Sequence, residues 1–470
     1  MAETDATIET AAPTPAFRDA DGAVSRAYVD AVSETVRAGD VALLRALVSD
    51  LHESDVADLL VELREEERPR LVELLGADFD FATLTELDET VRVQILDELP
   101  TATVVEGFRD LDSDDAVYIL EDMNAEDRAE ILERLPVPDQ LALRRSLDFP
   151  EQSAGRRMQT EFIAVPPFWT VGQTIDFLRE TGDLPDDFYE ILVVDPGYRL
   201  VGSVSLDRLL RSRRPVRIED ILSDDVHPVR VDQDQEEAAR LFERYNLVSA
   251  PVVDEHDRLV GVIMIDDIVD VIQEEAEEDI RALGGVGDEE MSDRVPVIIR
   301  SRFPWLFFNM FTAFVAASVI GLFDGTIERM VALAVLMPIV ASMGGNAGTQ
   351  AMTVTVRALA TREIGGRNAR RVVGRELLVG LLNGSMLAVL VGSGAALWFG
   401  DVELGGVIGA ALIVNMTVAG LFGVVIPLTL SRMKLDPAVA SAVFLTTVTD
   451  VVGFFAFLGL AAWWFGLGLG

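Results

Sequence analysis

The 470-residue sequence contains no cysteine, which excludes disulfide bonds and thiolate metal sites. Histidine is nearly absent too. The three histidines (His52, His227 and His256) are scattered, so no zinc or haem site is expected. Lysine occurs once, at Lys434, and every other basic residue is arginine. The formal net charge of −40 argues against nucleic-acid binding, which needs a basic footprint.

Charged and apolar residues occupy different parts of the chain. Acidic residues crowd the first two-thirds, to about Asp293, whereas the chain after Phe303 is almost continuously apolar. This division predicts a soluble region followed by a membrane domain. So acidic a surface with one lysine is also typical of a halophile, whose high-salt cytoplasm would explain much of the charge without any sensing role. No basic segment followed by a short apolar run opens the sequence, so no cleavable signal peptide is expected.

The soluble region is expected to begin with a helical repeat. Residues 1–24 lack periodicity and are predicted to be a disordered tail, while residues 25–150 carry apolar residues at spacings of three and four. The recurring units ILDELP, ILEDM and ILERLP predict a superhelix of short α-helices. Ser113 and Asn124 stand at positions expected of helix N-caps, because acidic residues follow each of them.

A duplication follows the repeat. The segment ILVVDPGYRLVGSVSLDRLL, which starts at Ile191, aligns with APVVDEHDRLVGVIMIDDIV, which starts at Ala250, at an offset of 59 residues. Each copy reads as strand, turn, strand and helix, with another helix ahead of it. This pattern predicts two α/β modules, residues 151–216 and 217–275. Residues 276–302 are expected to form a connecting helix that leads to the membrane.

Residues 303–470 contain apolar segments long enough to cross a bilayer. The five segments run over about residues 303–323, 330–352, 377–399, 404–430 and 438–465. Basic residues precede the first segment and lie between the second and third and between the fourth and fifth. The positive-inside rule therefore places the soluble region in the cytoplasm and the C-terminus outside the plasma membrane. The predicted fold class is a multidomain membrane protein with an all-α superhelical N-domain, an α/β pair and a five-helix transmembrane domain.

An aspartate stands inside the last apolar segment. A carboxylate at the centre of a membrane helix costs about 2.5–3.5 kcal/mol on insertion scales, so Asp450 is expected to face a bundle interior or an aqueous path. Thr446 lies one turn earlier on the same face and offers an oxygen. Mg2+ prefers oxygen ligands and often keeps its waters, so the pair predicts a cation site. The structural alternative is a protonated carboxyl group bonded to another helix.

The second apolar segment carries the motif PIVASMGGNAGTQ. Pro338 removes a helical hydrogen bond, and three glycines are expected to loosen the backbone where it lines a cavity: Gly344, Gly345 and Gly348. Asn346 supplies polar atoms beside them. The alternative is a kinked helix packed through its glycines. Two GxxxG pairs in later segments are interpreted as helix contacts: Gly380 with Gly384, and Gly405 with Gly409.

Clustered acids predict a metal-dependent sensor. Along the last helix of the second module and into the connector they are Asp266, Asp267, Asp270, Glu275, Glu278 and Asp279. Asp114 and Asp115 open a helix of the repeat. Carboxylates that face one another repel until a divalent ion bridges them. Each cluster taken singly is also typical of a solvated surface.

The order of the motifs resembles that of the MgtE family of magnesium channels and transporters. These motifs are LHESDVADLL, LDSDDAVYILEDM, EQSAGRRM, the duplicated modules, GGNAGTQ and TTVTDVVG, and the modules themselves resemble a tandem CBS pair. The resemblance covers nearly everything after Ser25. It implies a homodimer with the pore on its axis, embedded in membrane lipids. It also implies that Mg2+ bound by the helical domain and the CBS modules closes this pore through the connecting helix.

The resemblance also assigns residues. It implies that Asp450 is the pore aspartate and that Asn346 is the glycine-flanked asparagine of the pore. The regulatory acids would be Asp267, Asp270, Glu275, Glu278 and Asp279, with the acid of the helical domain at Asp114 or Asp115. A family position that is usually acidic is Gln273 here. Mg2+ would thus be both the transported and the regulatory ion.

CBS pairs often bind adenine nucleotides through a hydroxyl residue and an aspartate after the second strand. The first module has Ser205 but Arg208 at the acid position, and the second has Asp267 but Met264 at the hydroxyl position. Neither copy keeps both residues, so ATP binding is not expected.

The sequence also bears on functions other than Mg2+-gated Mg2+ uptake. The sequence has no P-loop, nucleophile elbow or metalloprotease helix motif, so an enzyme is not expected. A CBS-gated anion or solute transporter is disfavoured by the intramembrane Asp450 and the absence of basic pore residues. Transport of Co2+, Mn2+, Ni2+ or Ca2+ stays open, although oxygen ligands without cysteine or intramembrane histidine favour harder ions. A channel and a coupled carrier both fit the sequence.

Overall fold

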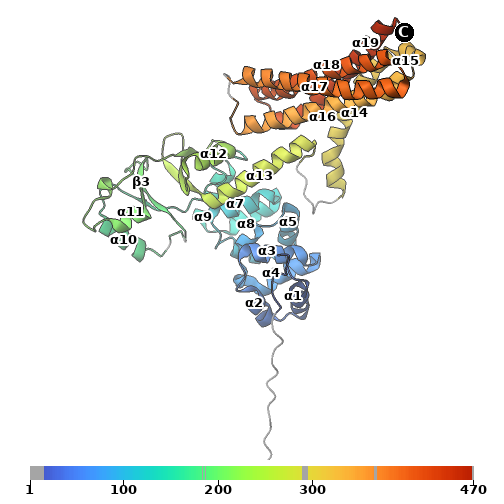
Figure 1. Cartoon of the computed structure of the whole chain (residues 1–470). Coiled ribbons are helices and arrows are strands. Elements are labelled where there is room, and N and C mark those ends of the chain that lie inside the picture. The colour runs from blue at the N-terminus through green and yellow to red at the C-terminus, as the bar shows by residue number, and fades with distance from the viewer. Residues whose placement is uncertain (1–14, 183, 186, 288–294, 365–367, 468–470) are drawn as a thin grey trace, which may run out of the picture. The chain divides into compact units, whose positions relative to one another are not determined.

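A computed structural model describes residues 15–182, 184–185, 187–287, 295–364 and 368–467. The chain divides into two compact units, Met1–Glu274 and Glu275–Gly470. The predicted fold class is confirmed (Figure 1). The first unit contains short helices and two small sheets, and the second contains five helices long enough to cross a membrane.

Short helices build the first part of the first unit. They are α1 (Arg26–Ala38), α2 (Val41–Val48), α3 (Glu53–Glu62), α4 (Arg68–Leu75), α5 (Glu89–Glu98), α6 (Thr101–Gly107), α7 (Ser113–Asp122), α8 (Ala125–Arg134) and α9 (Val137–Leu147), with short 3-10 turns η1 (Glu65–Glu67), η2 (Gly76–Asp78) and η3 (Phe81–Leu84). Their aliphatic residues form one core, in which Leu44, Leu59 and Ile119 are fully buried. Burial of these apolar stripes stabilises helices too short to persist alone.

The two predicted N-caps have different outcomes. Asn124 caps α8, because its Oδ1 accepts hydrogen bonds from the backbone N–H groups of Glu126 and Asp127. Ser113 is instead the first residue of α7, so its prediction as the cap is wrong. The carboxylate of Glu161, 48 residues further along, accepts from the Ser113 hydroxyl at 2.7 Å and from its backbone N–H at 3.3 Å. A distant carboxylate therefore serves the start of α7, where negative charge is favourable.

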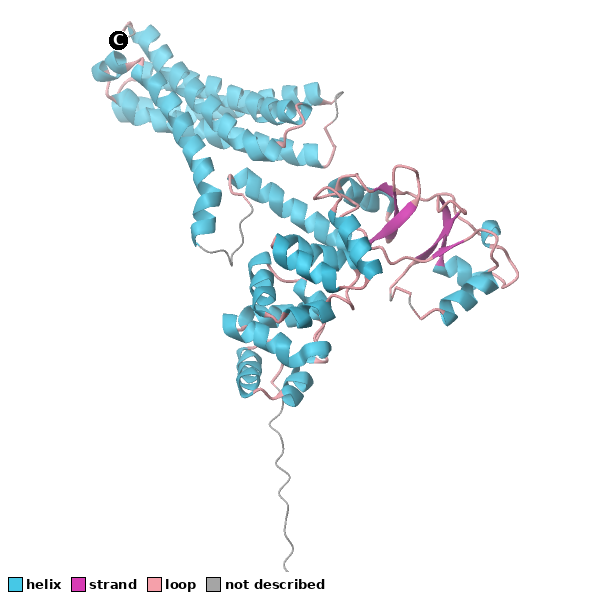
Figure 2. Ribbon diagram, turned by 180° about the vertical axis from the view of Figure 1, so that it is seen from behind, coloured by secondary structure: helices cyan, strands magenta, loops and turns pink. Residues whose placement is uncertain are grey.

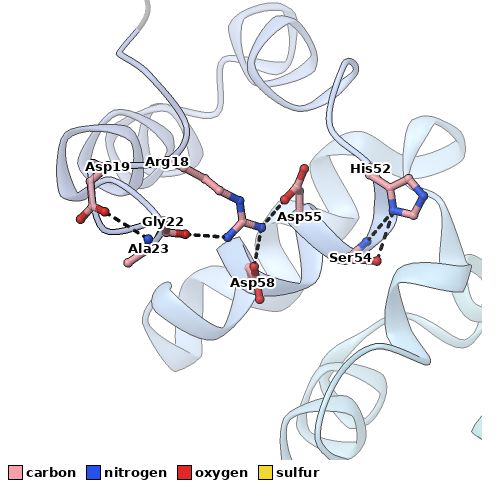
Figure 3. A network of polar contacts seen from close by, with 8 residues as sticks. All are labelled: Arg18, Asp19, Gly22, Ala23, His52, Ser54, Asp55 and Asp58. Atoms are coloured by element: carbon pink, nitrogen blue, oxygen red, sulfur yellow. Dashed lines mark hydrogen bonds and ion pairs between the residues drawn. The ribbon is translucent and has the colours of Figure 1, made fainter. Parts of the chain in front are cut away.

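Part of the predicted tail is folded. Residues 15–24 form a turn on the helical domain, whereas residues 1–14 lie outside the described residues. The ring of Phe17 meets Tyr28 edge-on, with centroids 5.2 Å apart. Arg18 forms ion pairs with Asp55 and Asp58 of α3 (Figure 3). One aromatic and one arginine thus hold a segment that shows no periodicity.

The duplication produces two sheets with the same topology. β1 (Ala164–Val165), β2 (Glu190–Val194) and β3 (Leu200–Ser205) form one sheet, and β4 (Val229–Arg230), β5 (Ser249–Val253) and β6 (Leu259–Met264) form the other (Figure 2). In each sheet the first pair of strands is parallel and the second antiparallel. Glu190 pairs with Ser205 as Ser249 pairs with Met264, so the registers repeat at the predicted offset. The accompanying helices are α10 (Val171–Glu180), α11 (Leu206–Arg211) and α12 (Gln235–Tyr245), with the turn η4 (Ile218–Asp220).

Helix α13 (Ile265–Gly284) follows β6 and begins eleven residues before the predicted connector. It ends where Gly285 adopts the left-handed conformation, with φ of 69°. Within the second unit its last turn packs on two membrane helices: Ala282 belongs to a buried cluster with Met352, Val356, Ala438 and Leu445.

The remaining helices of the second unit are long and apolar. They are α14 (Val295–Gly321), α16 (Ala332–Ala360), α17 (Ala369–Phe399), α18 (Val402–Arg432) and α19 (Pro437–Phe465), with the short α15 (Asp324–Arg329) after α14. Figure 1 shows α16 to α19 running side by side. Asp436 caps α19, since its carboxylate accepts from the N–H of Ala438 at 2.7 Å, and Pro437 is the first helical residue. Both positions agree with the sequence.

Glycines let α17 and α18 approach closely. A Cβ built on Gly380 would lie 2.5 Å from the carbonyl oxygen of Met416, and one on Gly405 would lie 2.4 Å from that of Gly392. Gly384 and Gly409 face the same interface. The interpretation of both GxxxG pairs as helix contacts therefore agrees with the structure.

Candidate cation sites

The membrane site is built on α19. Asp450 lies near the middle of this helix, and no hydrogen bond or ion pair engages its carboxylate within the described part of the chain. Thr446, one turn earlier, is exposed in the single chain and donates its hydroxyl to the carbonyl of Ala442 at 3.0 Å. A hydroxyl that donates still has lone pairs for a cation. The two residues therefore present oxygen ligands on a helix face that the chain itself leaves partly open.

Asn346 lies on α16, where the backbone differs from expectation. The helix is continuous from Ala332 to Ala360, so the prediction of a loosened backbone is wrong. Of the alternative, a kinked helix packed through its glycines, the packing agrees with the structure at Gly344 and Gly348. A Cβ on Gly348 would lie 3.0 Å from the side chain of Leu445 on α19. Gly344 and Gly348 make room for neighbouring side chains and do not unwind the helix, whereas Gly345 has no neighbour within 4 Å. As Gly348 meets Leu445, Asn346 and Thr446 belong to adjoining turns of two packed helices.

Within the first unit, α7 brings its acids to the first turns of α13. The acidic seam, as we name it here, consists of Glu53, Asp112, Asp114, Asp115, Asp266, Asp267 and Asp270. Burial, then the charge of Asp267, raises the pKa of Asp114 well above its usual range. Burial and the neighbouring carboxylates raise the pKa of Asp115 to about 7 and that of Asp267 to about 8. These raised values show that ionisation of the seam is costly.

The sequence-predicted residues are only partly brought together. Asp114, Asp115, Asp267 and Asp270 meet in the seam, and burial followed by the charge of Glu86 raises the pKa of Asp270. Three further predicted acids lie on α13 beyond the boundary between the units, at helical spacings of three and four: Glu275, Glu278 and Asp279. No three histidine or carboxylate side chains among the described residues converge closely enough to hold a metal ion. The seam has the charge for a divalent ion, but its ligands are not drawn together.

Ser205 and Asp267, the two residues that fit the nucleotide-binding pattern, each have a partner within the chain. The hydroxyl of Ser205 donates to Asp207 at 2.6 Å. Asp267 belongs to the seam and accepts a long hydrogen bond, 3.4 Å, from the backbone N–H of Met264.

Two residues of these sites were missed from the sequence. Arg157 is the cation at the edge of the seam, and its charge opposes the rise in the pKa of Asp270. Asn415 is a fully buried amide in α18. A polar residue inside an apolar segment was the signal that identified Asp450, and the same signal marks Asn415 in the segment LIVNMTV.

Comparison with known proteins matches each of the three regions of the chain in part. Residues 51–152 match the MgtE intracellular N domain, residues 154–214 and 218–274 match CBS domains, and residues 337–460 match the MgtE family described as divalent cation transporters. The chain is 34% identical to the magnesium transporter MgtE of Thermus thermophilus over 92% of this chain and 97% of the relative. The chain belongs to the MgtE family.

Other MgtE proteins give similar results. The magnesium transporter MgtE of Bacillus subtilis is 30% identical over 91% of this chain and 95% of its own length. Among solved structures, the cytosolic domain of the Mg2+ channel MgtE in complex with ATP is 32% identical and covers 52% of this chain and 99% of that chain, with a TM-score of 0.49. The family assignment places this chain among multi-pass membrane transport proteins whose N-terminal and CBS domains are cytosolic.

Proposed function

We propose that this chain is a Mg2+ channel or transporter for Mg2+ uptake, with its permeation site at Asp450. The observation that carries the proposal is an intramembrane carboxylate with no hydrogen-bonding or ionic partner among the described residues, in a chain whose curated relatives are magnesium transporters. An unpaired carboxylate at this depth is a functional-site signal.

The pore chemistry follows from the donor set. Asp450 supplies negative charge, while Thr446 and Asn346 supply neutral oxygens. Because Mg2+ dehydrates reluctantly, one carboxylate per chain suits an ion that keeps its water shell. A homodimer with the pore on its axis brings two Asp450 side chains to one ion. A potential of 100 mV contributes about 4.6 kcal/mol to the entry of a doubly charged ion.

Cytoplasmic Mg2+ closes the pore in this proposal. Regulatory Mg2+ is held by carboxylates of the acidic seam and of α13: Asp114, Asp115, Asp267, Asp270, Glu275, Glu278 and Asp279. Support comes from the raised pKa values of the seam, because mutually repelling carboxylates gain most from a bound divalent cation. Ala282, in the last turn of α13, packs on α16 and α19, so a movement of α13 is transmitted to the helices that carry Asn346 and Asp450.

The test is Mg2+ influx into proteoliposomes for the wild type, Asp450→Asn and Asp436→Asn. Asp436→Asn is the matched control, since it makes the same substitution on the same helix and asparagine caps helices as well as aspartate does. We expect loss of flux in Asp450→Asn alone. Wild-type flux in a folded Asp450→Asn protein would rule out the permeation site.

A second part of the flux experiment tests the Mg2+ sensor. Mg2+ on the sensor side should suppress flux in the wild type, and Asp267→Asn should shift this suppression to higher Mg2+ concentrations. Asp225→Asn, at an exposed position of the CBS region, serves as the control. Suppression that is unchanged in Asp267→Asn would remove this carboxylate from the sensor.

The ion transported is tested by competition. Ca2+, Co2+, Mn2+ and Ni2+ are added in turn outside the vesicles, and uptake of each is measured directly. Mg2+ uptake that persists in their excess supports the proposal. Uptake of another of these ions in preference to Mg2+ would make the chain a transporter of that ion, and the family description as divalent cation transporter accommodates this alternative.

A further inference from the structure

One amide side chain lies at the junction of α16, α18 and α19. Asn415, on α18, has an exposed fraction of 0%. Its Nδ2 donates a hydrogen bond of 2.8 Å to the backbone carbonyl of Val340 on α16. Its Oδ1 has no hydrogen-bond partner among the described residues. An acceptor left without a donor in an interior is costly and calls for an explanation.

Two glycines form the notch that holds this amide. A Cβ on Gly344 of α16 would lie 2.2 Å from Asn415 Nδ2, and a Cβ on Gly453 of α19 would lie 2.7 Å from the same atom. Neither glycine position accepts a side chain without displacement of the amide or of a helix. The carboxamide therefore sets how closely α16 and α19 approach α18 at this level.

The notch lies within one helical turn of two residues of the proposed permeation site. Gly344 is two residues from Asn346, and Gly453 is three residues from Asp450. The carbonyl that Asn415 binds, that of Val340, is the one whose helical partner would be the N–H of Gly344. Two residues earlier, Pro338 has no N–H to donate. The amide of Asn415 therefore binds α16 close to Pro338, where the missing N–H makes the helix easiest to bend.

We propose that Asn415 is the positioning residue of the pore, which fixes the distance between Asn346 and Asp450 and thereby the preference for Mg2+. This inference rests on the permeation site proposed above. Selectivity among divalent ions depends on cavity size and rigidity. An amide that joins three helices supplies both. A residue that served only to fill space would not need a polar group with an unpaired oxygen.

The experiment compares Asn415→Leu with Asn383→Leu in the full-length chain in proteoliposomes. Leucine has the same branched shape as asparagine, and it removes both the hydrogen bond to Val340 and the unpaired oxygen. Asn383, on α17, is exposed and is the matched control. Uptake of Mg2+ and of Ca2+ is measured against ion concentration, and thermal unfolding is followed separately. Asp450→Asn is included in the same series.

For Asn415→Leu we expect a folded protein with its thermal midpoint retained and its preference for Mg2+ over Ca2+ reduced by up to about a hundredfold, the effect that a misplacement of about 1 Å has on enzyme rates. Asn383→Leu should keep the wild-type ratio. An unchanged ratio in Asn415→Leu while Asp450→Asn is inactive overturns the positioning role and leaves the permeation site intact. Wild-type flux in Asp450→Asn overturns both.

A second set of variants keeps the inference testable if Asn415→Leu does not fold. Gly344→Ala pushes a methyl group into the carboxamide, and Asn415→Ala empties the notch. If the two residues act through one contact, the double variant should be no less selective than Asn415→Ala alone, because the new methyl group fills the vacated space. Losses of selectivity that simply add would show that Asn415 does not position α16 through this contact.

Discussion

The guanidinium of Arg157 lies over the ring of Tyr118, with its central carbon 5.3 Å from the ring centroid. Tyr118 belongs to α7, the helix that carries two acids of the seam. The same guanidinium forms an ion pair with Glu274 of α13 and donates from Nε to Gln235 of α12 at 3.0 Å. The guanidinium of Arg92 also lies over Tyr118, with its central carbon 4.5 Å from the ring centroid. One arginine therefore joins the helical domain to the second CBS module beside the acidic seam.

This contact predicts that Arg157→Ala weakens the first unit most when Mg2+ is absent. The variant loses a cation–π contact and a charge-assisted bond, together worth about 1–2 kcal/mol. It also removes a positive charge that offsets repulsion in the seam. Thermal unfolding of the full chain with and without Mg2+ measures the effect. Arg144→Ala, at an exposed position of α9, is the control, and an equal effect of both substitutions would contradict the prediction.

The proposed topology predicts which side of the membrane each connection faces. As the chain has no cysteine, single cysteines introduced at Met433 and Leu467 are unique labels. A membrane-impermeant maleimide added to intact cells should label Leu467→Cys, beyond the end of α19, and should label Met433→Cys only after permeabilisation. Met433 lies after α18 and is 63% exposed. Labelling of Met433→Cys in intact cells would reverse the orientation.

Periodic and repeated features of the fold were predictable from the sequence. The offset between Ile191 and Ala250 reappears in the strand registers, since identical patterning imposes identical pairing. The start of α19 followed from Asp436 and Pro437, which act within one turn of chain. Family, fold class and membrane segments depend on such local signals.

Features that depend on distant partners were not predictable in this way. Ser113 has the composition of a cap, but the carboxylate that completes the start of α7 comes from Glu161. Gly344 suggests a loosened helix, but the amide of Asn415 fills the space beside it. Of the candidate acids, only the fold shows that Asp114 and Asp267 are close enough to perturb each other. Sequence identifies the residue types, and tertiary contacts decide which of them form a site.

Close helix packing in the membrane domain gives a prediction with an adjacent control. Gly405→Ala would drive a methyl group against the Gly392 carbonyl, and such overpacking costs about 1–3 kcal/mol. Gly406→Ala meets nothing within 4 Å and should be neutral or slightly stabilising, because alanine favours helix over glycine by about 1 kcal/mol. Thermal unfolding in detergent compares the two. Equal stability of both variants would show that α17 and α18 separate readily.

The acidic seam makes stability depend on pH in a definite direction. Asp115, with a pKa of about 7, and Asp267, with a pKa of about 8, bind protons more tightly in the folded chain than in the unfolded chain, where an aspartate has a pKa of about 3.9. Between about pH 4 and pH 8 the folded state therefore binds more protons than the unfolded state, so the free energy of unfolding falls as pH rises through this range. Asp254 acts oppositely: hydrogen bonds from Arg258 lower its pKa to about 2, so its contribution is lost only below about pH 4.

We therefore expect the Mg2+-free chain to unfold at a lower temperature at pH 8 than at pH 5. Added Mg2+ should narrow the difference, because a bound cation replaces the protons that the carboxylates release. Asp267→Asn should flatten the pH dependence because it removes one of the mutually repelling carboxylates, and Asp225→Asn should leave the pH dependence unchanged. The measurement is thermal unfolding of each protein from pH 5 to pH 8 at constant ionic strength, since screening alone weakens the repulsion. A thermal midpoint that rises with pH would mean that these carboxylates are already neutralised in the folded chain by groups other than a metal ion.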